Sequence, residues 1–198
     1  MPEILTVGHS THELSELVAL LSGAAIEAIA DVQRFPGSRR HPQFASASLA
    51  QTLPQAKIGC LHLSELGGRR APRADSPNTA WRNDSFRGYA DHLPSHEFTV
   101  GLSRLEAMAA ANRTAIMCAE AVWWRCHRRL LADVLLPRGW SVRQVMPDGR
   151  LVVHELSPIA DAGRMACRSI LPPPTRRGCG LNHRARMRRA GRVTRLRP

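Results

Sequence analysis

Apolar residues follow two alternating patterns along the chain. Short continuous apolar runs are typical of buried strands, and segments with apolar residues three or four positions apart are typical of amphipathic helices. The expected strands are residues 3–7, 26–32, 59–63, 114–117, 141–145 and 151–154. The expected helices are residues 14–23, 46–53, 86–93, 97–111 and 130–136. This alternation predicts an α/β fold, a single domain of residues 1–158 with a central, mostly parallel sheet flanked by helices.

Two further features concern the segments between these elements. Ser10 followed three residues later by Glu13 forms a capping box, which predicts the start of the first helix. Residues 64–85 form a long irregular stretch between the third strand and the third helix. Stretches of this length inside a compact domain are usually functional lids or disordered segments, so both interpretations apply here.

Charge is distributed unevenly along the chain. The formal net charge is +12, but residues 1–158 carry 17 basic and 15 acidic side chains and are nearly neutral. Residues 159–198 carry 11 arginines against the single acid Asp161, and they include three consecutive prolines at 172–174. A basic segment without an apolar period predicts a disordered C-terminal tail. Such a tail could bind nucleic acid through its charge or simply remain solvated.

Composition also limits the cellular location. No apolar run approaches the roughly 20 residues that span a bilayer, so we expect no membrane partner. The first residues carry Glu3 instead of a basic region, and their apolar stretch is too short for a signal peptide, which favours a cytoplasmic protein. Five cysteines without regular spacing favour reduced thiols over a disulfide framework.

Chemically reactive side chains are most concentrated in residues 118–128, between an expected strand and an expected helix. This segment combines two thiols, a carboxylate, an imidazole and arginines. In open α/β sheets, ligands bind just beyond the carboxyl ends of strands, where helix N-termini also point. The segment is therefore the first candidate for an active site.

Polar residues and glycines also follow three other expected strands. They are Gly8, His9 and Ser10 after the first strand, Asp31 and Arg34 at the second, and Gly67 and Gly68 after the third. In a parallel sheet these segments converge on one edge, so we expect one composite site. Taken alone, Ser10 is equally well explained as a helix cap, and Asp31 as the ion-pair partner of an arginine.

We assign expected roles within this composite site by side-chain chemistry. The candidate catalytic residues are Cys118, Glu120, Asp31, His9 and His127. The candidate ligand-binding residues are Gly8, Ser10, Arg34, Arg39, Gly67, Gly68, Arg87, Arg125 and Arg128. Arginines interleaved with aromatic residues suit a phosphate- or base-bearing ligand, although a solvated surface with ordinary ion pairs is the alternative.

Cys118 is the expected nucleophile. A thiol near a helix N-terminus and close to Arg125 should have a depressed pKa and be ionised. Six residues separate Cys118 from Arg125, whereas the phosphate-binding loop of tyrosine phosphatases has five, and this difference argues against a simple phosphatase. A buried structural thiol is the alternative interpretation.

Metal ligands are also present in principle. The candidates are Cys118, Cys126, His127, His62 and His9. The chain has no Cys-x2-Cys pair and no His-x3-His pair among them, so the spacing signal for zinc is weak and the sequence predicts no metal site. The sequence indicates no particular cofactor.

Five motifs in order resemble the domain-of-unknown-function 488 family, a group of uncharacterised α/β proteins. They are VGHS at 7–10, DVQRFPGSR at 31–39, HLSELGG at 62–68, FRGYA at 86–90, and MCAE at 117–120 with RCHR at 125–128. The resemblance covers roughly residues 3–157 and implies an α/β fold without an established reaction. Gln33 stands where the family often has an arginine.

Three hypotheses for function follow. The first is an enzyme that acts on a small anionic ligand, phosphate- or nucleotide-bearing, at the carboxyl edge of the sheet. The second is a nucleic-acid-associated protein that uses the arginine loops and the basic tail. The third is a binding module without catalysis.

Overall fold

The computed structural model describes residues 1–35 and 41–159 of the chain. The expected ligand-binding residue Arg39 lies outside the described residues. The same holds for the expected basic tail from residue 160 onward.

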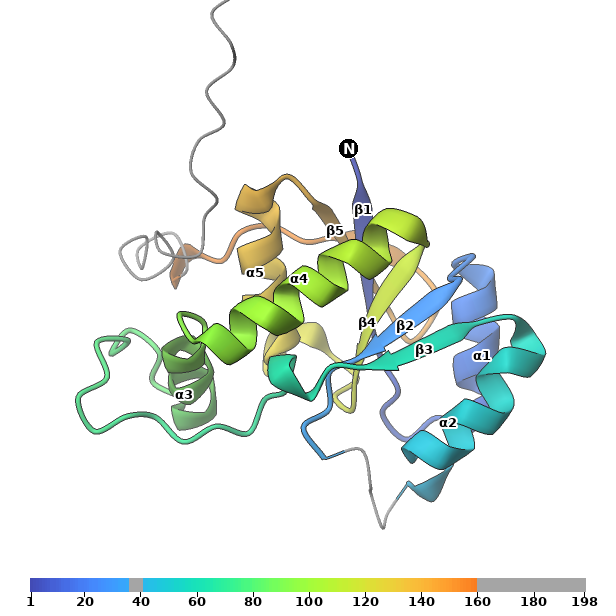
Figure 1. Ribbon diagram of the computed structural model, residues 1–198, viewed down its shortest axis with the longest axis horizontal. Helices are drawn as coiled ribbons and strands as arrows, with labels where there is room; N and C mark the ends of the chain where they lie inside the picture. The colour runs from blue at the N-terminus through green and yellow to red at the C-terminus, as the bar shows by residue number, and fades with distance from the viewer. Residues whose placement is uncertain (36–40, 160–198) are drawn as a thin grey trace, which may run out of the picture.

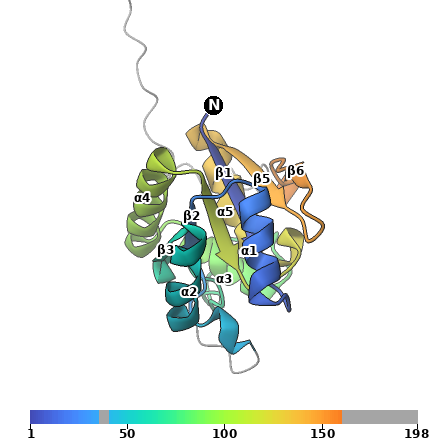
Figure 2. The ribbon, with the colours of Figure 1, turned by 90° about the vertical axis from the view of Figure 1, so that its right-hand side faces the viewer.

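Within the described residues, six strands form one sheet in the order β3-β2-β4-β1-β5-β6 (Figure 1 and Figure 2). The strands are β1 (Glu3–Gly8), β2 (Ala28–Asp31), β3 (Gly59–His62), β4 (Thr114–Cys118), β5 (Ser141–Val145) and β6 (Leu151–Val153). All neighbouring pairs are parallel except β5 and β6, which form an antiparallel hairpin. The expected α/β fold with a mostly parallel sheet is therefore confirmed.

Five α-helices in this part of the chain connect and cover the strands. They are α1 (Leu14–Gly23), α2 (Ser46–Thr52), α3 (Asp84–His92), α4 (His96–Ala111) and α5 (Arg128–Leu135). Short 3-10 turns occupy Pro42–Phe44, Leu53–Ala56, Ser64–Leu66, Trp123–Arg125 and Leu136–Arg138. Each expected helix is present within a few residues of its expected bounds.

The sheet separates two apolar cores. Side chains of a strand alternate between its faces, so Ile4 enters one core while its neighbour Leu5 enters the other. Helices α3, α4 and α5 contribute to the first core, and α1 and α2 to the second. Figure 2 shows α4 and α1 on opposite sides of the strands. Burial on both faces explains why the central strands are continuous apolar runs.

The expected capping box at Ser10 is wrong. Helix α1 begins at Leu14, its N-cap is Glu13, and the N–H of Glu13 donates to the Glu16 carboxylate at 2.9 Å. Ser10 instead adopts a positive φ of 50°, and its N–H donates to the carbonyl of Ala119 at 2.9 Å. Ser10 therefore attaches the segment after β1 to the loop after β4 by a hydrogen bond. The helix starts about one turn after the position that a cap at Ser10 would give it.

A buried polar network attaches the hairpin of β5 and β6 to α5. Asp133 on α5 lies 2.9 Å from His154 Nε2 and accepts a hydrogen bond from the Ser157 hydroxyl at 2.7 Å. The other imidazole nitrogen lies 3.2 Å from the side-chain nitrogen of Gln144, whose oxygen accepts a hydrogen bond from the Thr6 hydroxyl. These polar groups are buried, so their mutual hydrogen bonds are needed to offset the loss of water.

We expect His154→Ala to lower the free energy of unfolding by about 2–3 kcal/mol, because it leaves buried partners without a hydrogen bond. Val153→Ala is the control, since Val153 is 66% exposed and should matter little. Urea denaturation of the two variants measures the difference. Equal losses would show that the network does not hold the hairpin.

Candidate functional site

The carboxyl ends of four parallel strands lie in one row. Gly8 of β1 pairs with Cys118 of β4, and Asp31 of β2 lies between Met117 of β4 and His62 of β3. The strand ends that carry the candidate residues therefore share one edge of the sheet, as their parallel arrangement requires.

A cavity of about 310 Å³ opens at this edge. Its walls come from the segment after β2, the segment after β3, the start of α3, and the loop from β4 to α5. The lining residues are Gln33, Arg34, Phe35, Gly68, Arg69, Asn83, Ser85, Phe86, Cys118, Ala119, Glu120, Arg125, Cys126 and His127. Six expected site residues thus line one cavity: Cys118, Glu120, His127, Arg34, Gly68 and Arg125.

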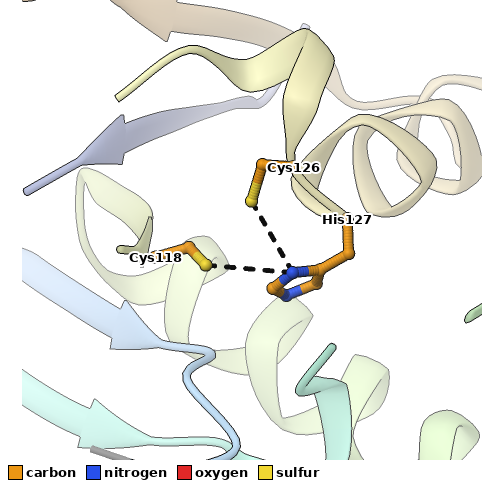
Figure 3. A group of neighbouring side chains, drawn as sticks. All are labelled: Cys118, Cys126 and His127. Carbon is orange, nitrogen blue, oxygen red and sulfur yellow. Dashed lines mark hydrogen bonds between the residues drawn. The ribbon is translucent and has the colours of Figure 1, made fainter. Parts of the chain in front are cut away.

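Two thiols and an imidazole cluster at this cavity (Figure 3). Nδ1 of His127 lies 3.8 Å from Sγ of Cys118 and 3.6 Å from Sγ of Cys126. Both sulfur atoms point toward the imidazole ring in Figure 3. Of the five metal ligands considered from the sequence, these three lie together.

The local chain path explains the cluster. Cys118 is the last residue of β4, whereas Cys126 follows a 3-10 turn and His127 is the N-cap of α5. Gly68 lies against the imidazole, because a Cβ atom added there would be 2.6 Å from His127 Nδ1. A glycine at position 68 therefore lets the segment after β3 approach the cluster.

The two thiols differ in their affinity for a proton. The hydrogen bond to Cys126 and then burial raise the pKa of Cys118 well above its usual value. The same hydrogen bond from Cys118, with a further one from His127, lowers the pKa of Cys126 well below its usual value. The expectation of a depressed pKa at Cys118 is therefore wrong, because the hydrogen bond with a second thiol and burial determine the shift, and Arg125 is not among its causes. Cys126 is the more readily ionised thiol.

The loop after β4 crosses closely over the end of β1. A Cβ atom added at Gly8 would lie 1.9 Å from the carbonyl oxygen of Glu120. Nη2 of Arg128 donates to the same carbonyl at 2.5 Å, and Nη1 donates to the Thr6 hydroxyl at 3.4 Å. Arg128 is 1% exposed and does not line the cavity. It therefore braces the loop, in contrast to its expected role as an anion ligand.

His9 also lies beside the cavity without lining it. Its N–H donates to the carbonyl of Cys118 at 3.0 Å, and its ring stacks on Phe44 with centroids 4.0 Å apart. Nε2 of His9 lies 3.3 Å from Oε1 of Gln33, which does line the cavity. Burial lowers the pKa of His9, so the neutral imidazole is favoured. His9 thus contacts the side chain of Gln33 on the side away from the cavity.

Asp31 is buried below the cavity, with 1% of its surface exposed. Its Oδ1 accepts a hydrogen bond from the N–H of Gln33 at 3.0 Å. Burial raises the pKa of Asp31, and the hydrogen bond from Gln33 opposes that shift only in part. The carboxyl group therefore holds the segment after β2 and does not line the cavity.

The other expected ligand-binding residues outside the cavity lining are Gly8, Ser10, Gly67 and Arg87. Gly67 packs on the backbone of the neighbouring segment, since an added Cβ would lie 2.8 Å from Cα of Arg34. Arg87 forms an ion pair with Asp84 at 2.6 Å within the first turn of α3. None of these four residues lines the cavity.

Sequence reasoning missed several lining residues. Cys126 was considered only as a metal ligand, although it lies in the densest reactive segment. Asn83 and Ser85 were missed because the long stretch before α3 carries no periodic signal. Asn83 is the N-cap of α3, and its side chain accepts from the N–H groups of Ser85 and Phe86. An Asn at the end of an irregular stretch was the available signal.

A family model described as "Domain of unknown function DUF488" matches residues 13–135. The chain belongs to this family. The DUF488 match contains the whole cavity lining, from Gln33 to His127, but not β1 or the hairpin of β5 and β6. Comparison with curated proteins and with solved structures gave no significant match.

Within the described residues of this DUF488 protein, no helix is both long and apolar enough to cross a membrane. The expected cytoplasmic location stays a prediction.

We expect Gly8→Ala to lower the free energy of unfolding by about 2–3 kcal/mol, because its methyl group would overlap the Glu120 carbonyl. Gly23→Ala is the matched control, since a Cβ there meets nothing within 4 Å. That control should be neutral or stabilising by up to about 1 kcal/mol. Urea denaturation compares the two. Similar effects at both positions would contradict the close crossing.

Asp31→Asn should make the protein more stable than wild type as the pH rises. Because the folded-state pKa of Asp31 is raised, the unfolded chain loses this proton at a lower pH than the folded protein does, from about pH 4 upward. The free energy of unfolding of the wild type therefore falls as the pH rises from there, until the pH passes the folded-state pKa. Denaturation midpoints of both proteins between about pH 4 and pH 8 test this, since the amide does not titrate. A constant difference, or a wild type that gains with pH, would contradict the raised pKa.

Proposed function

We propose that the protein is an enzyme that acts on a small anionic ligand, such as a phosphate ester or a nucleotide, bound in the cavity at the carboxyl edge of the sheet. In this proposal the arginines of the cavity bind the anion. The cluster of Cys118, Cys126 and His127, together with the Glu120 carboxylate, forms the reactive end.

The observation that carries the proposal is that three arginines of the cavity have no carboxylate partner among the described residues. Arg34, Arg69 and Arg125 all line the cavity, and within residues 1–35 and 41–159 none of them is paired with a carboxylate. By contrast, eight other arginines in the described part of the chain form ion pairs: Arg70, Arg73, Arg87, Arg104, Arg113, Arg138, Arg143 and Arg150.

Unpaired guanidiniums around a cavity attract an anion from solution. Each guanidinium can donate two parallel hydrogen bonds to phosphate oxygens, and a charged partner makes these bonds stronger than neutral ones. Among the described residues that line the cavity, Glu120 is the single carboxylate, so these residues carry an excess of positive charge. This charge balance favours an anionic ligand over a cationic one.

The size and the composition of the cavity suit a small molecule. A volume of about 310 Å³ lies at the lower end of the range for small-molecule sites, roughly 300–1,000 Å³. Phe35 and Phe86 add apolar surface beside the arginines, and the thiol–imidazole cluster adds groups that react with electrophiles or bind metals. A binding module would not need the reactive groups, which is why we favour an enzyme.

Nucleic acid is the second candidate ligand. Phe35 is 64% exposed, and the guanidinium carbon of Arg34 lies 5.7 Å from its ring centroid. An exposed ring beside a guanidinium suits stacking on a base. The experiment below separates this candidate from the small anion.

We expect inorganic pyrophosphate to bind the full chain at low salt and to raise its thermal midpoint. In the double variant Arg34→Ala/Arg125→Ala, affinity measured by calorimetry should fall at least about tenfold, because two charge-assisted contacts are lost. Arg150→Ala is the matched control, since Arg150 pairs with Asp148 on the surface and does not line the cavity. It should bind pyrophosphate like the wild type.

Other outcomes count against the proposal. Equal binding by the double variant and the control would place any anion site elsewhere. If a single-stranded oligonucleotide binds far more tightly than pyrophosphate and displaces it, and the double variant loses both, the cavity is a nucleic-acid interface instead.

A further inference from the structure

We propose that Cys118, Cys126 and His127 bind a single zinc ion, whose fourth coordination position faces the cavity. The inference deepens the proposed function, because it assigns a metal to the reactive end of the same cavity. It is tested separately from anion binding, as described below.

The spacing of the three ligand atoms fits tetrahedral zinc. With zinc–sulfur and zinc–nitrogen bonds of about 2.3 and 2.05 Å, a tetrahedral angle places sulfur and nitrogen about 3.6 Å apart. The two observed separations from His127 Nδ1 are 3.8 Å to Cys118 and 3.6 Å to Cys126. All three ligand atoms lie within 4.8 Å of one another. An ion therefore fits between them with little movement of the side chains.

The ligands lie at the end of β4 and at the start of α5. Cys118 ends the central strand β4, and His127 is the N-cap of α5, with Cys126 directly before it. Arg128 fixes the loop between them through the Glu120 carbonyl. Preorganised ligands of this kind lower the entropic cost of binding a metal, compared with ligands on mobile loops.

The arrangement leaves one side of the ion open. All three ligand residues line the cavity, and Gly68 offers no side chain at the place where a Cβ would be 2.6 Å from His127 Nδ1. Zinc sites with three protein ligands and an open position are typically catalytic, whereas structural sites have four protein ligands. The open position would hold a water molecule that faces the arginines.

A water molecule on zinc loses a proton near neutral pH and becomes a strong nucleophile. Glu120 places a carboxylate in the same cavity, where it can accept this proton. In zinc-dependent nucleobase deaminases, one imidazole and two thiolates hold the zinc ion that activates water. A glutamate that is not a ligand transfers the proton. The donor set is therefore suited to hydrolysis of a phosphate ester. The oxygen of water would bond to phosphorus while the bond from phosphorus to the alcohol oxygen breaks, and the proton taken up by Glu120 would pass to the leaving alcohol.

The test uses the full chain, purified without a histidine tag from cells grown with zinc. Elemental analysis should find about one zinc per chain in the wild type and very little in Cys126→Ser or His127→Gln. Cys60→Ser is the matched control, because Cys60 lies on β3 outside the cluster. A Cys167→Ser/Cys179→Ser double variant covers the remaining cysteines of the sequence. Both controls should keep about one zinc per chain.

A second measurement does not depend on how the variants fold. After zinc is removed, Co²⁺ titrated into the wild-type chain should give the visible bands of a tetrahedral ion and the near-ultraviolet charge-transfer band of thiolate ligands. Saturation at about one equivalent would match a single site.

Three outcomes would overturn the proposal. In the first, the wild type holds no zinc and gives no thiolate band with Co²⁺. In the second, the Cys167→Ser/Cys179→Ser variant loses zinc and the Cys126→Ser and His127→Gln variants keep it. In the third, the freshly purified chain contains a stable Cys118–Cys126 disulfide. The Arg34→Ala/Arg125→Ala variant should still hold about one zinc. A chain that fails to bind pyrophosphate can therefore still be shown to hold zinc. A chain that holds no zinc can likewise still be tested for pyrophosphate binding.

Discussion

The arrangement at the carboxyl edge depends on one buried guanidinium. Arg128 reaches from α5 under the loop after β4, where it donates to the carbonyl of Glu120 and to the hydroxyl of Thr6. Gly8 permits the same loop to lie directly on the end of β1. A buried charge is costly unless hydrogen bonds satisfy it, so the position of Arg128 and the path of the loop fix each other. The place of Cys118 relative to His127 follows from that path.

Much of the fold could be predicted from the sequence, because each central strand is buried on both faces and is a plain apolar run. The edge that carries the site also followed from the rule that parallel strands end together. The roles of individual arginines could not be predicted in this way. Arg125 and Arg128 are three positions apart and chemically identical, yet one lines the cavity and the other is 1% exposed. Their difference depends on Thr6 and Gly8, more than one hundred positions away in the chain.

The thiols illustrate the same limit. The sequence indicated a reactive cysteine after β4, and Cys118 was expected to be ionised by a helix N-terminus and Arg125. Its pKa depends instead on Cys126, which a turn of irregular backbone brings beside it. Similarly, His9 and Asp31 were expected to face a ligand, but neither lines the cavity, and both contact Gln33, which does. Residues behind a cavity and residues lining it carry the same side chains, so only the packing distinguishes them.

Part of the buried network at α5 lies outside the region that identifies the family. The family match ends at residue 135 and begins at residue 13, so it omits β1, which lies between β4 and β5. It also omits His154 and Ser157, which satisfy the buried Asp133 carboxylate of α5. A fragment cut at the family boundaries would keep only β2, β3 and β4, so the edge of β4 that faces β1 would be unpaired. It would also leave the buried side chain of Asp133 without these hydrogen-bond partners. A fragment for expression, or for comparing relatives, should therefore run from β1 to Ser157, because these contacts lie well beyond the region by which the family is identified.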